Sequence, residues 1–209
     1  MSTPTWFITG AGSGLCAVEE QDERDIRAQF EVNVFAPIEL IRLVLPGMRA
    51  RRIGTIVNIS SMDGISSLPA NGYYSATKFA LEGLTESLWQ EIEPIGLRAF
   101  LVEPGSFRTG IEQRTHVSGH TIADYDASSG AFIRAVSAVQ PEQFPGDPDR
   151  AAEAILRNVR AAEPRHWLVL GSDAYRRIGE KLTRFHAEFD AGREVAEATD
   201  FPGSGPAVL

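Results

Sequence analysis

The sequence predicts a single α/β domain in which a doubly wound parallel sheet carries helices on both faces. Three observations predict it. The 209 residues suit one domain with a sizeable core. Short apolar runs alternate along the chain with long segments whose apolar residues recur every three or four positions. No internal repeat or linker divides the chain, so we expect one domain over residues 1–209.

The elements of the first half follow from these patterns. Trp6–Thr9 is a short apolar run that predicts a strand, and it leads into a glycine-rich loop. A long amphipathic helix is expected over residues 22–53, with Asp22 or Asp25 as its cap. Pro37 lies inside this helix and should kink it, because proline donates no backbone hydrogen bond. A buried strand over 55–60 and a second long helix over 74–95 complete this half.

The second half begins with a buried strand over residues 97–102, which Glu103-Pro104-Gly105 ends. Residues 106–145 lack a clean period and predict a mobile, substrate-binding loop with one or two short helices. The remaining expected elements are a helix over 147–162, a strand over 166–170 and a final helix over 173–188.

Composition excludes several classes of function. A net charge of -8 argues against binding to a nucleic-acid backbone, and the Arg49, Arg51 and Arg52 cluster suits a solvated helix end. The single cysteine, Cys16, leaves no internal disulfide, which fits a reducing cytoplasm. We find no signal peptide at the start of the chain and no apolar run that could span a bilayer. The four histidines lack ligand spacing, so we expect no metal.

Four polar residues carry the expected chemistry. Tyr74 and Lys78 lie four residues apart and share one helix face, Ser61 precedes Tyr74 by thirteen residues, and Asn33 lies midway along the first long helix. Reduction of a ketone by a nicotinamide needs a proton donor for the oxygen, and a nearby ammonium should lower the pKa of a tyrosine toward neutral pH. A serine hydroxyl can orient the carbonyl, and an asparagine can hold a water for proton relay. Each residue alone could have a purely structural role, for example as a surface Tyr-Lys pair. The spacing of all four residues together favours a catalytic site.

These residues resemble the motifs of the short-chain dehydrogenase/reductase family, which has a Rossmann-type fold. The resemblance covers residues 5–15 and about 17–110, while the last hundred residues fit loosely. The matching runs are Tyr74–Lys78, Asn58–Ser61, Val32–Val34, Pro104–Thr109 and Thr9–Gly14.

The resemblance implies a role for each matched position. Tyr74 would be the general acid/base, Lys78 would lower its pKa and bind the nicotinamide ribose, Ser61 would orient the carbonyl, and Asn33 would serve the relay. The remaining cofactor contacts are expected near the pyrophosphate from Gly10, Ser13, Gly14 and Leu15, and at the nicotinamide end from Pro104, Gly105, Phe107 and Thr109. The cofactor is NADP or NAD, with a slight preference for NADP.

The chain departs from the family after Leu15. Cys16 stands where a third glycine is expected, and the sequence then resembles a part of the family that lies far downstream. On the order of 70 residues, about two βαβ units, are absent between Leu15 and Cys16. Either the protein contains a segment that the numbering skips, or the chain has a true deletion. We favour the first, because the first strand could not otherwise close onto the sheet; an intact mass of 22.8 kDa would contradict it.

Three functions remain open on these residues. The favoured one is an NAD(P)-dependent oxidoreductase acting on a secondary alcohol or a ketone. A sensor that binds the dinucleotide without turnover would use the same fold. Epimerase or dehydratase chemistry on a nucleotide sugar is disfavoured because the C-terminal part is too short. We expect a medium-sized, largely apolar substrate, and a homodimer or homotetramer formed through the two long helices.

Overall fold

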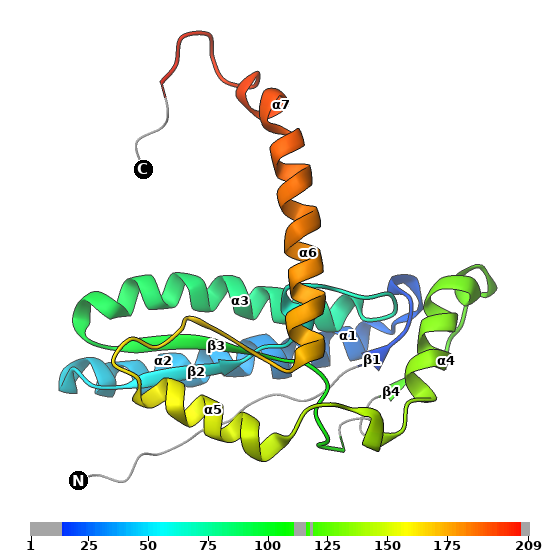
Figure 1. Cartoon of the computed structure of the whole chain (residues 1–209), viewed down its shortest axis with the longest axis horizontal. Helices are drawn as coiled ribbons and strands as arrows, with labels where there is room; N and C mark the ends of the chain where they lie inside the picture. Colours follow the sequence, from blue (N-terminus) through cyan, green and yellow to red (C-terminus); the bar gives the residue numbers. More distant parts are fainter. Residues whose placement is uncertain (1–13, 111–115, 118, 206–209) are drawn as a thin grey trace.

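The computed structural model describes residues 14–110, 116–117 and 119–205, and these form an α/β fold around a parallel sheet (Figure 1). The sheet contains β2 (Thr55–Ile59), β3 (Arg98–Pro104) and β5 (Trp167–Leu170), in the order β2-β3-β5. Both pairings are parallel; Ile56 lies opposite Ala99, and Val102 opposite Leu168. The predicted parallel sheet is therefore confirmed for these three strands.

Two long helices cover one face of this sheet. They are α2 (Ala36–Arg51) and α3 (Gly72–Ile92), and Figure 1 shows both running along the strands. Alternation along the strands directs every second side chain toward these helices. The core on this face comprises Ile41, Ile56, Leu88, Trp89, Ile92, Leu97, Ala99 and Leu101.

The intervening residues of β3, Phe100 and Val102, point to the opposite face and are fully buried. On this side lies α5 (Pro148–Arg160), which begins at the predicted Asp147 cap. Helices therefore lie on both faces, as the sequence predicts. The chain then enters α6 (Ser172–Ala191), whose first half packs on the body while its second half projects into solvent, followed by α7 (Arg193–Glu197) (Figure 1).

The first long helix is interrupted where the sequence predicts a kink. It consists of α1 (Glu23–Phe30) with Asp22 as its cap, a single π-helical stretch η2 (Glu31–Phe35), and α2. Pro37 occupies the first turn of α2. Because proline cannot donate to the carbonyl one turn earlier, the wider turn of η2 accommodates the missing bond.

The N-terminal part differs from the single-sheet prediction. Gly14–Leu15 forms a short strand, β1, which pairs in parallel with β4 (His116–Val117) in a separate two-stranded sheet. The strand predicted over residues 6–9 lies outside the described residues. Cys16 follows directly, is buried, and donates its N–H to the carbonyl of Ala70 at 2.9 Å. With no glycine-loop helix after Leu15, this segment packs as an extended chain beside the start of α3.

The predicted loop over 106–145 holds more regular structure than expected. Among the described residues it contains β4 and α4 (Ala131–Ser137), the latter preceded by a π-helical turn, η7 (Asp126–Gly130). An exposed ion pair at 2.5 Å joins Arg134 to Asp126 within this unit. The other short helices of the described chain are η1 (Val18–Glu20), η3 (Met62–Gly64), η4 (Glu93–Ile95), η6 (Ala123–Tyr125) and η8 (Pro141–Gln143).

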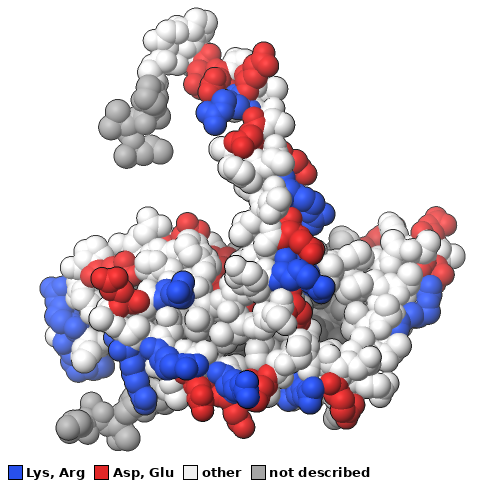
Figure 2. Space-filling view, viewed as in Figure 1, with Lys and Arg blue, Asp and Glu red and all other residues white. Residues whose placement is uncertain are grey.

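Charges of both signs cover the surface seen in Figure 2. Lys and Arg gather at one end and along the lower edge, and along that edge acidic side chains lie between them. Within the described ranges, no helix combines the length and apolar character that crossing a bilayer requires.

The turn between α5 and β5 depends on one buried amide. Asn158 donates from Nδ2 to the Arg165 carbonyl at 3.0 Å and accepts the Arg165 N–H at 2.9 Å. We expect Asn158→Ala to lower the free energy of unfolding by about 1–2 kcal/mol, because both backbone groups lose their partner. Denaturant unfolding measures this loss. Glu153→Ala, at an exposed position of the same helix, serves as the control and should change stability by less than about 0.5 kcal/mol.

Candidate active site

Tyr74 and Lys78 lie next to each other at the beginning of α3. The Lys78 Nζ atom is 5.6 Å from the centroid of the Tyr74 ring. Lys78 is buried, and its ammonium donates to the backbone carbonyl of Ile59 at 3.0 Å, at the end of β2. The predicted sharing of one helix face is therefore observed, and the strand end anchors the lysine beside the phenol.

Ser61 joins the same site from the other side. It lies just past β2 and caps η3, where its Oγ accepts the N–H of Asp63 at 3.1 Å. Its side chain also lies close enough to Tyr74 to lower the pKa of the phenol. Because the strand end and the start of α3 meet here, residues thirteen positions apart become neighbours.

The pKa of Tyr74 differs from the sequence-based expectation. Burial raises it to about 12; the Ser61 hydrogen bond opposes this rise, while the charge of Asp63 adds to it. Burial also lowers the pKa of Lys78 to about 8. The expectation that Lys78 makes the phenol acidic is thus wrong for the ligand-free protein. Both groups are removed from water, so each is shifted toward its neutral form.

Asn33 lies in the π-helical stretch η2, next to the Tyr-Lys helix. It is 1% exposed, and its Nδ2 donates to Thr77 Oγ1 at 3.2 Å. Thr77 in turn donates to the carbonyl of Tyr74 at 2.7 Å. The asparagine is therefore held against the turn of α3 that separates Tyr74 from Lys78.

An ion pair that the sequence does not predict holds the loop that follows Ser61. Arg177 on α6 pairs with Asp63, and the same Nη2 donates to the Ser66 carbonyl at 2.6 Å. Asp63 Oδ2 lies 3.4 Å from Ser61 Oγ. These side chains are largely buried, at 16% exposure for Arg177 and 11% for Asp63. No local pattern could reveal the pair, because 114 residues separate its members.

The residues predicted to contact the pyrophosphate do not form an open loop where the structure describes them. Gly10 and Ser13 lie outside the described residues. Gly14 and Leu15 are buried in β1, and a Cβ on Gly14 would lie only 2.8 Å from the Gln29 side-chain amide. The structure therefore does not bring Gly14 and Leu15 to an open helix N-terminus.

The predicted nicotinamide-end residues follow β3. Pro104 ends the strand, and the N–H of Gly105 donates to the Leu170 carbonyl at 2.8 Å. Asp173 of α6 approaches Gly105 so closely that a Cβ there would lie 2.2 Å from its Oδ1, and Asp173 accepts the N–H of Ser106 at 2.8 Å. Gly105 is thus needed for the close approach of this carboxylate.

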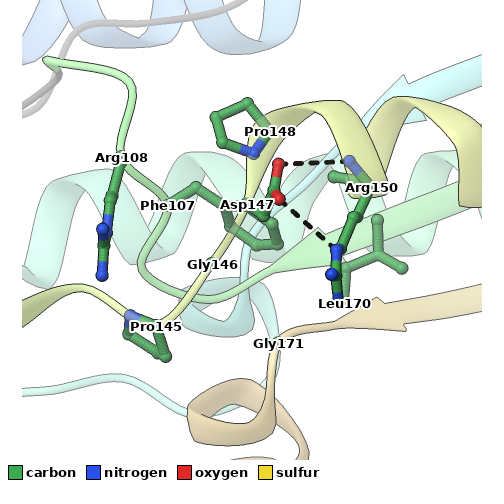
Figure 3. Close-up of a pocket in the computed structure, with 10 residues that line it drawn as sticks. Phe107, Arg108, Pro145, Gly146, Asp147, Pro148, Arg150, Leu170 and Gly171 are labelled. Carbon is green, nitrogen blue, oxygen red and sulfur yellow. Dashed lines mark hydrogen bonds and ion pairs between the residues drawn. The ribbon is translucent and has the colours of Figure 1, made fainter.

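A pocket of about 620 Å³ opens beyond the carboxyl ends of β3 and β5 (Figure 3). Figure 3 shows Arg108 and Arg150 at opposite sides of it, with Asp147 ion-paired to Arg150 at 3.4 Å. Phe107 lines this pocket, and among the sequence-predicted site residues it alone does so within the described chain. The pocket residues are Phe107, Arg108, Pro145, Gly146, Asp147, Pro148, Arg150, Ala151, Leu170 and Gly171.

Comparison with known proteins agrees with this arrangement. The family model described as short chain dehydrogenase matches residues 5–118, more than half of the chain. This protein belongs to the short-chain dehydrogenase family. A solved short-chain dehydrogenase from Streptomyces avermitilis superposes with a TM-score of 0.82 at 36% identity, covering 91% of this chain and 68% of its own. The Rossmann-type fold of this short-chain dehydrogenase follows from that likeness.

This short-chain dehydrogenase also resembles a named reductase in sequence and a solved NADP complex in fold. The 3-ketodihydrosphingosine reductase of Bacteroides thetaiotaomicron is 35% identical over 160 residues, which are 76% of this chain and 59% of that protein. A short chain dehydrogenase from Burkholderia cenocepacia, solved in complex with NADP, shares the fold at 22% identity and a TM-score of 0.60, covering 83% of this chain and 61% of that one. The chain spans 59% and 55% of the first two curated relatives it matches.

Proposed function

We propose that this protein is an NAD(P)-dependent oxidoreductase that transfers a hydride between a nicotinamide and a secondary alcohol or ketone. The observation that carries the proposal is the position of the Lys78 Nζ atom, 5.6 Å from the centroid of the Tyr74 ring, beside the strand end that leads into Ser61. These groups come from one strand end and one helix start, where open α/β sheets bind their ligands.

Each residue has a distinct task in the proposed reduction. The nicotinamide supplies the hydride when bound. Tyr74 gives its hydroxyl proton to the carbonyl oxygen, and the Ser61 Oγ donates a hydrogen bond that orients the same oxygen. Lys78 uses one N–H on Ile59, which leaves further donors of its ammonium for a ribose hydroxyl. Asn33, held on Thr77, supports a water that returns a proton toward Lys78.

The nicotinamide end of the cofactor fits these residues better than the pyrophosphate end does. Lys78 and Tyr74 present donors beside the strand end, whereas Gly14 and Leu15 are buried in β1. We propose NADP or NAD, with a slight preference for NADP. We also propose that a segment of about 70 residues, expected between Leu15 and Cys16, would complete the dinucleotide site. Intact mass tests this last proposal.

The substrate, partners and location are proposals of the same kind. Residues 106–145 combine apolar and polar side chains and would close over a medium-sized, largely apolar carbonyl compound. Exposed apolar side chains on the two long helical segments suit a homodimer or homotetramer. They are Val32, Phe35, Leu43, Val44 and Phe79. A location in the cytoplasm fits the single buried Cys16.

One observation favours a second candidate, a protein that binds the dinucleotide without turnover. Burial raises the pKa of Tyr74 to about 12, so the ligand-free phenol is a poor base at neutral pH. The two candidates share the fold and the cofactor but differ in whether reduced cofactor is consumed.

A cofactor-consumption screen separates the candidates. The full protein is mixed with NADH or NADPH and a panel of ketones and aldehydes, and the loss of reduced-nicotinamide absorbance is followed. We expect consumption that depends on the carbonyl compound. Calorimetry with the same cofactors is the control. Cofactor binding without consumption across the panel would favour the second candidate. Absence of cofactor binding would contradict both candidates.

A further inference from the structure

The second half of α6 presents an apolar stripe that no part of the described chain covers. Figure 1 shows this half of the helix projecting away from the body, and all residues from 182 to 191 are exposed. Leu182, Phe185 and Phe189 have exposed fractions of 55%, 58% and 66%. Their spacing of three and four residues places the three side chains on one face of the helix.

This stripe continues a face that the first half of α6 buries against the body. Ile178 lies one turn before Leu182 and is 5% exposed, and Ala174 is fully buried one turn earlier. The same face of the helix is therefore a core contact at its beginning and a solvent-exposed apolar surface from Leu182 onward. A contiguous apolar surface of this kind marks an interaction site in a folded protein.

Two opposite charges lie along one flank of the stripe. Lys181 comes one helical turn before Phe185, and its Nζ atom is 5.8 Å from the centroid of that ring. Glu188 follows Lys181 by seven residues, which is two helical turns, and so lies on the same flank. About 10 Å of helix separates the two charged residues, so they are too far apart to pair with each other. Each charge is therefore available to a partner that lies along the stripe.

The stripe is complementary to itself when two such helices run in opposite directions. A two-fold axis at Phe185 brings the Phe185 rings of two copies together and sets Leu182 of one copy opposite Phe189 of the other. The same axis keeps both charged flanks on one side of the seam, so Lys181 of each copy faces Glu188 of the other. In a parallel pair the two charged flanks would lie on opposite sides of the seam, and these residues would not meet.

The exposed apolar area suits such a pair of chains. With this axis, Tyr175, which is 77% exposed, lies at the level of Val195 of the other copy, which is 72% exposed on α7. A buried aromatic side chain contributes about 150–250 Å², so the exposed apolar side chains of two copies provide on the order of 1,000 Å². Specific protein interfaces bury about 1,200–2,000 Å², so we expect an association of micromolar affinity.

The charge balance favours a second copy of the chain over a lipid surface. Residues 181–197 contain three Lys or Arg and four Asp or Glu residues. A helix that lies on a membrane usually has an excess of cations on its polar face, because the lipid surface is anionic. This segment has no such excess, whereas its alternation of charge along one flank matches a second copy.

We propose that α6 is an interface through which two copies of this chain associate, with the two helices antiparallel and centred on Phe185. This interface is separate from the one proposed on the two long helical segments. It also does not depend on the proposed oxidoreductase activity, so the two proposals can fail independently.

Sedimentation velocity of the full chain over a range of concentrations tests the interface. We expect the wild type to show an association step that Phe185→Glu weakens by at least about 30-fold, because the variant places a charge at the centre of the seam. Phe185 is exposed in the single copy, so this variant should keep the melting temperature of the monomer. Ala187→Glu introduces the same charge at an exposed position on the opposite face of α6 and should associate like the wild type.

An exchange of charges tests the antiparallel arrangement. Either Lys181→Glu or Glu188→Lys alone would place like charges opposite each other, and each should weaken the same association step about tenfold. The double variant restores two pairs of opposite charges with their signs exchanged, so it should recover most of the affinity. Weaker association in both single variants without recovery in the double variant would overturn the antiparallel arrangement.

Three results would overturn the interface itself. One is a wild type that stays monomeric at every concentration, and another is an association that Phe185→Glu leaves unchanged. The third comes from vesicles of phosphatidylcholine and phosphatidylglycerol. If monomeric wild type sediments with these vesicles and Phe185→Glu does not, the stripe binds a lipid surface instead of a second copy.

Discussion

Replacing Tyr74 with Phe is expected to reduce turnover by about 10³-fold, while the affinity for the nicotinamide cofactor changes by less than about twofold. The variant lacks the hydroxyl that would donate the proton, but it keeps the ring beside Lys78. Proton donation takes place only during the reaction, so the loss should lie mainly in kcat. Steady-state kinetics and calorimetric titration with the reduced cofactor measure the two effects.

The neighbouring tyrosine provides a matched control. Tyr73 donates its hydroxyl to the carbonyl of Val18 at 2.9 Å, away from Ser61 and Lys78. Tyr73→Phe should therefore cost some stability but leave turnover within about threefold of the wild type. Equal losses in the two variants would mean that the effect is structural, and Tyr74 would not be the acid/base group.

Removal of the Arg177 side-chain charge is expected to lower the free energy of unfolding by about 3–5 kcal/mol. In Arg177→Met, Asp63 stays buried without its cation, and the Ser66 carbonyl loses a donor. The first half of α6 would also detach more easily from the loop that carries Ser61, so the KM for a carbonyl substrate should rise. Urea unfolding measures the first effect and steady-state kinetics the second.

Two further variants test whether the buried ion pair causes this loss. Arg176→Met removes an exposed cation from the adjacent position of α6 and should change stability by less than about 0.5 kcal/mol. Adding Asp63→Asn to Arg177→Met removes the unpaired charge and should recover part of the stability. A double variant less stable than Arg177→Met would contradict the assignment of the loss to an uncompensated carboxylate.

The regular elements of the described chain were largely predictable because their signals are local. Apolar periodicity marked α2, α3 and β3 to within a few residues, and Asp22 and Asp147 marked two helix starts. Pro37 predicted the irregularity that the structure shows as η2. The Tyr74 and Lys78 pair was predictable for the same reason, since a spacing of four residues on a helix defines a shared face.

The segment around Leu15 was not predicted correctly. A glycine-rich run normally precedes a helix, but here Cys16 and a turn follow, and Gly14–Leu15 pairs with a strand a hundred residues later. Segment 106–145 was also underestimated, because short π-helical and 3₁₀ turns have no period that a sequence window can detect.

By itself, the sequence determined the order of strands and helices, the helix face shared by Tyr74 and Lys78, and the family to which the chain belongs. Tertiary structure alone decided the protonation of the site, the contact between Arg177 and Asp63, and the enclosure of Glu103. Periodicity and caps act over one or two helical turns, so they can be read along the chain. A pKa depends on which distant groups exclude water from a side chain, and folding decides that.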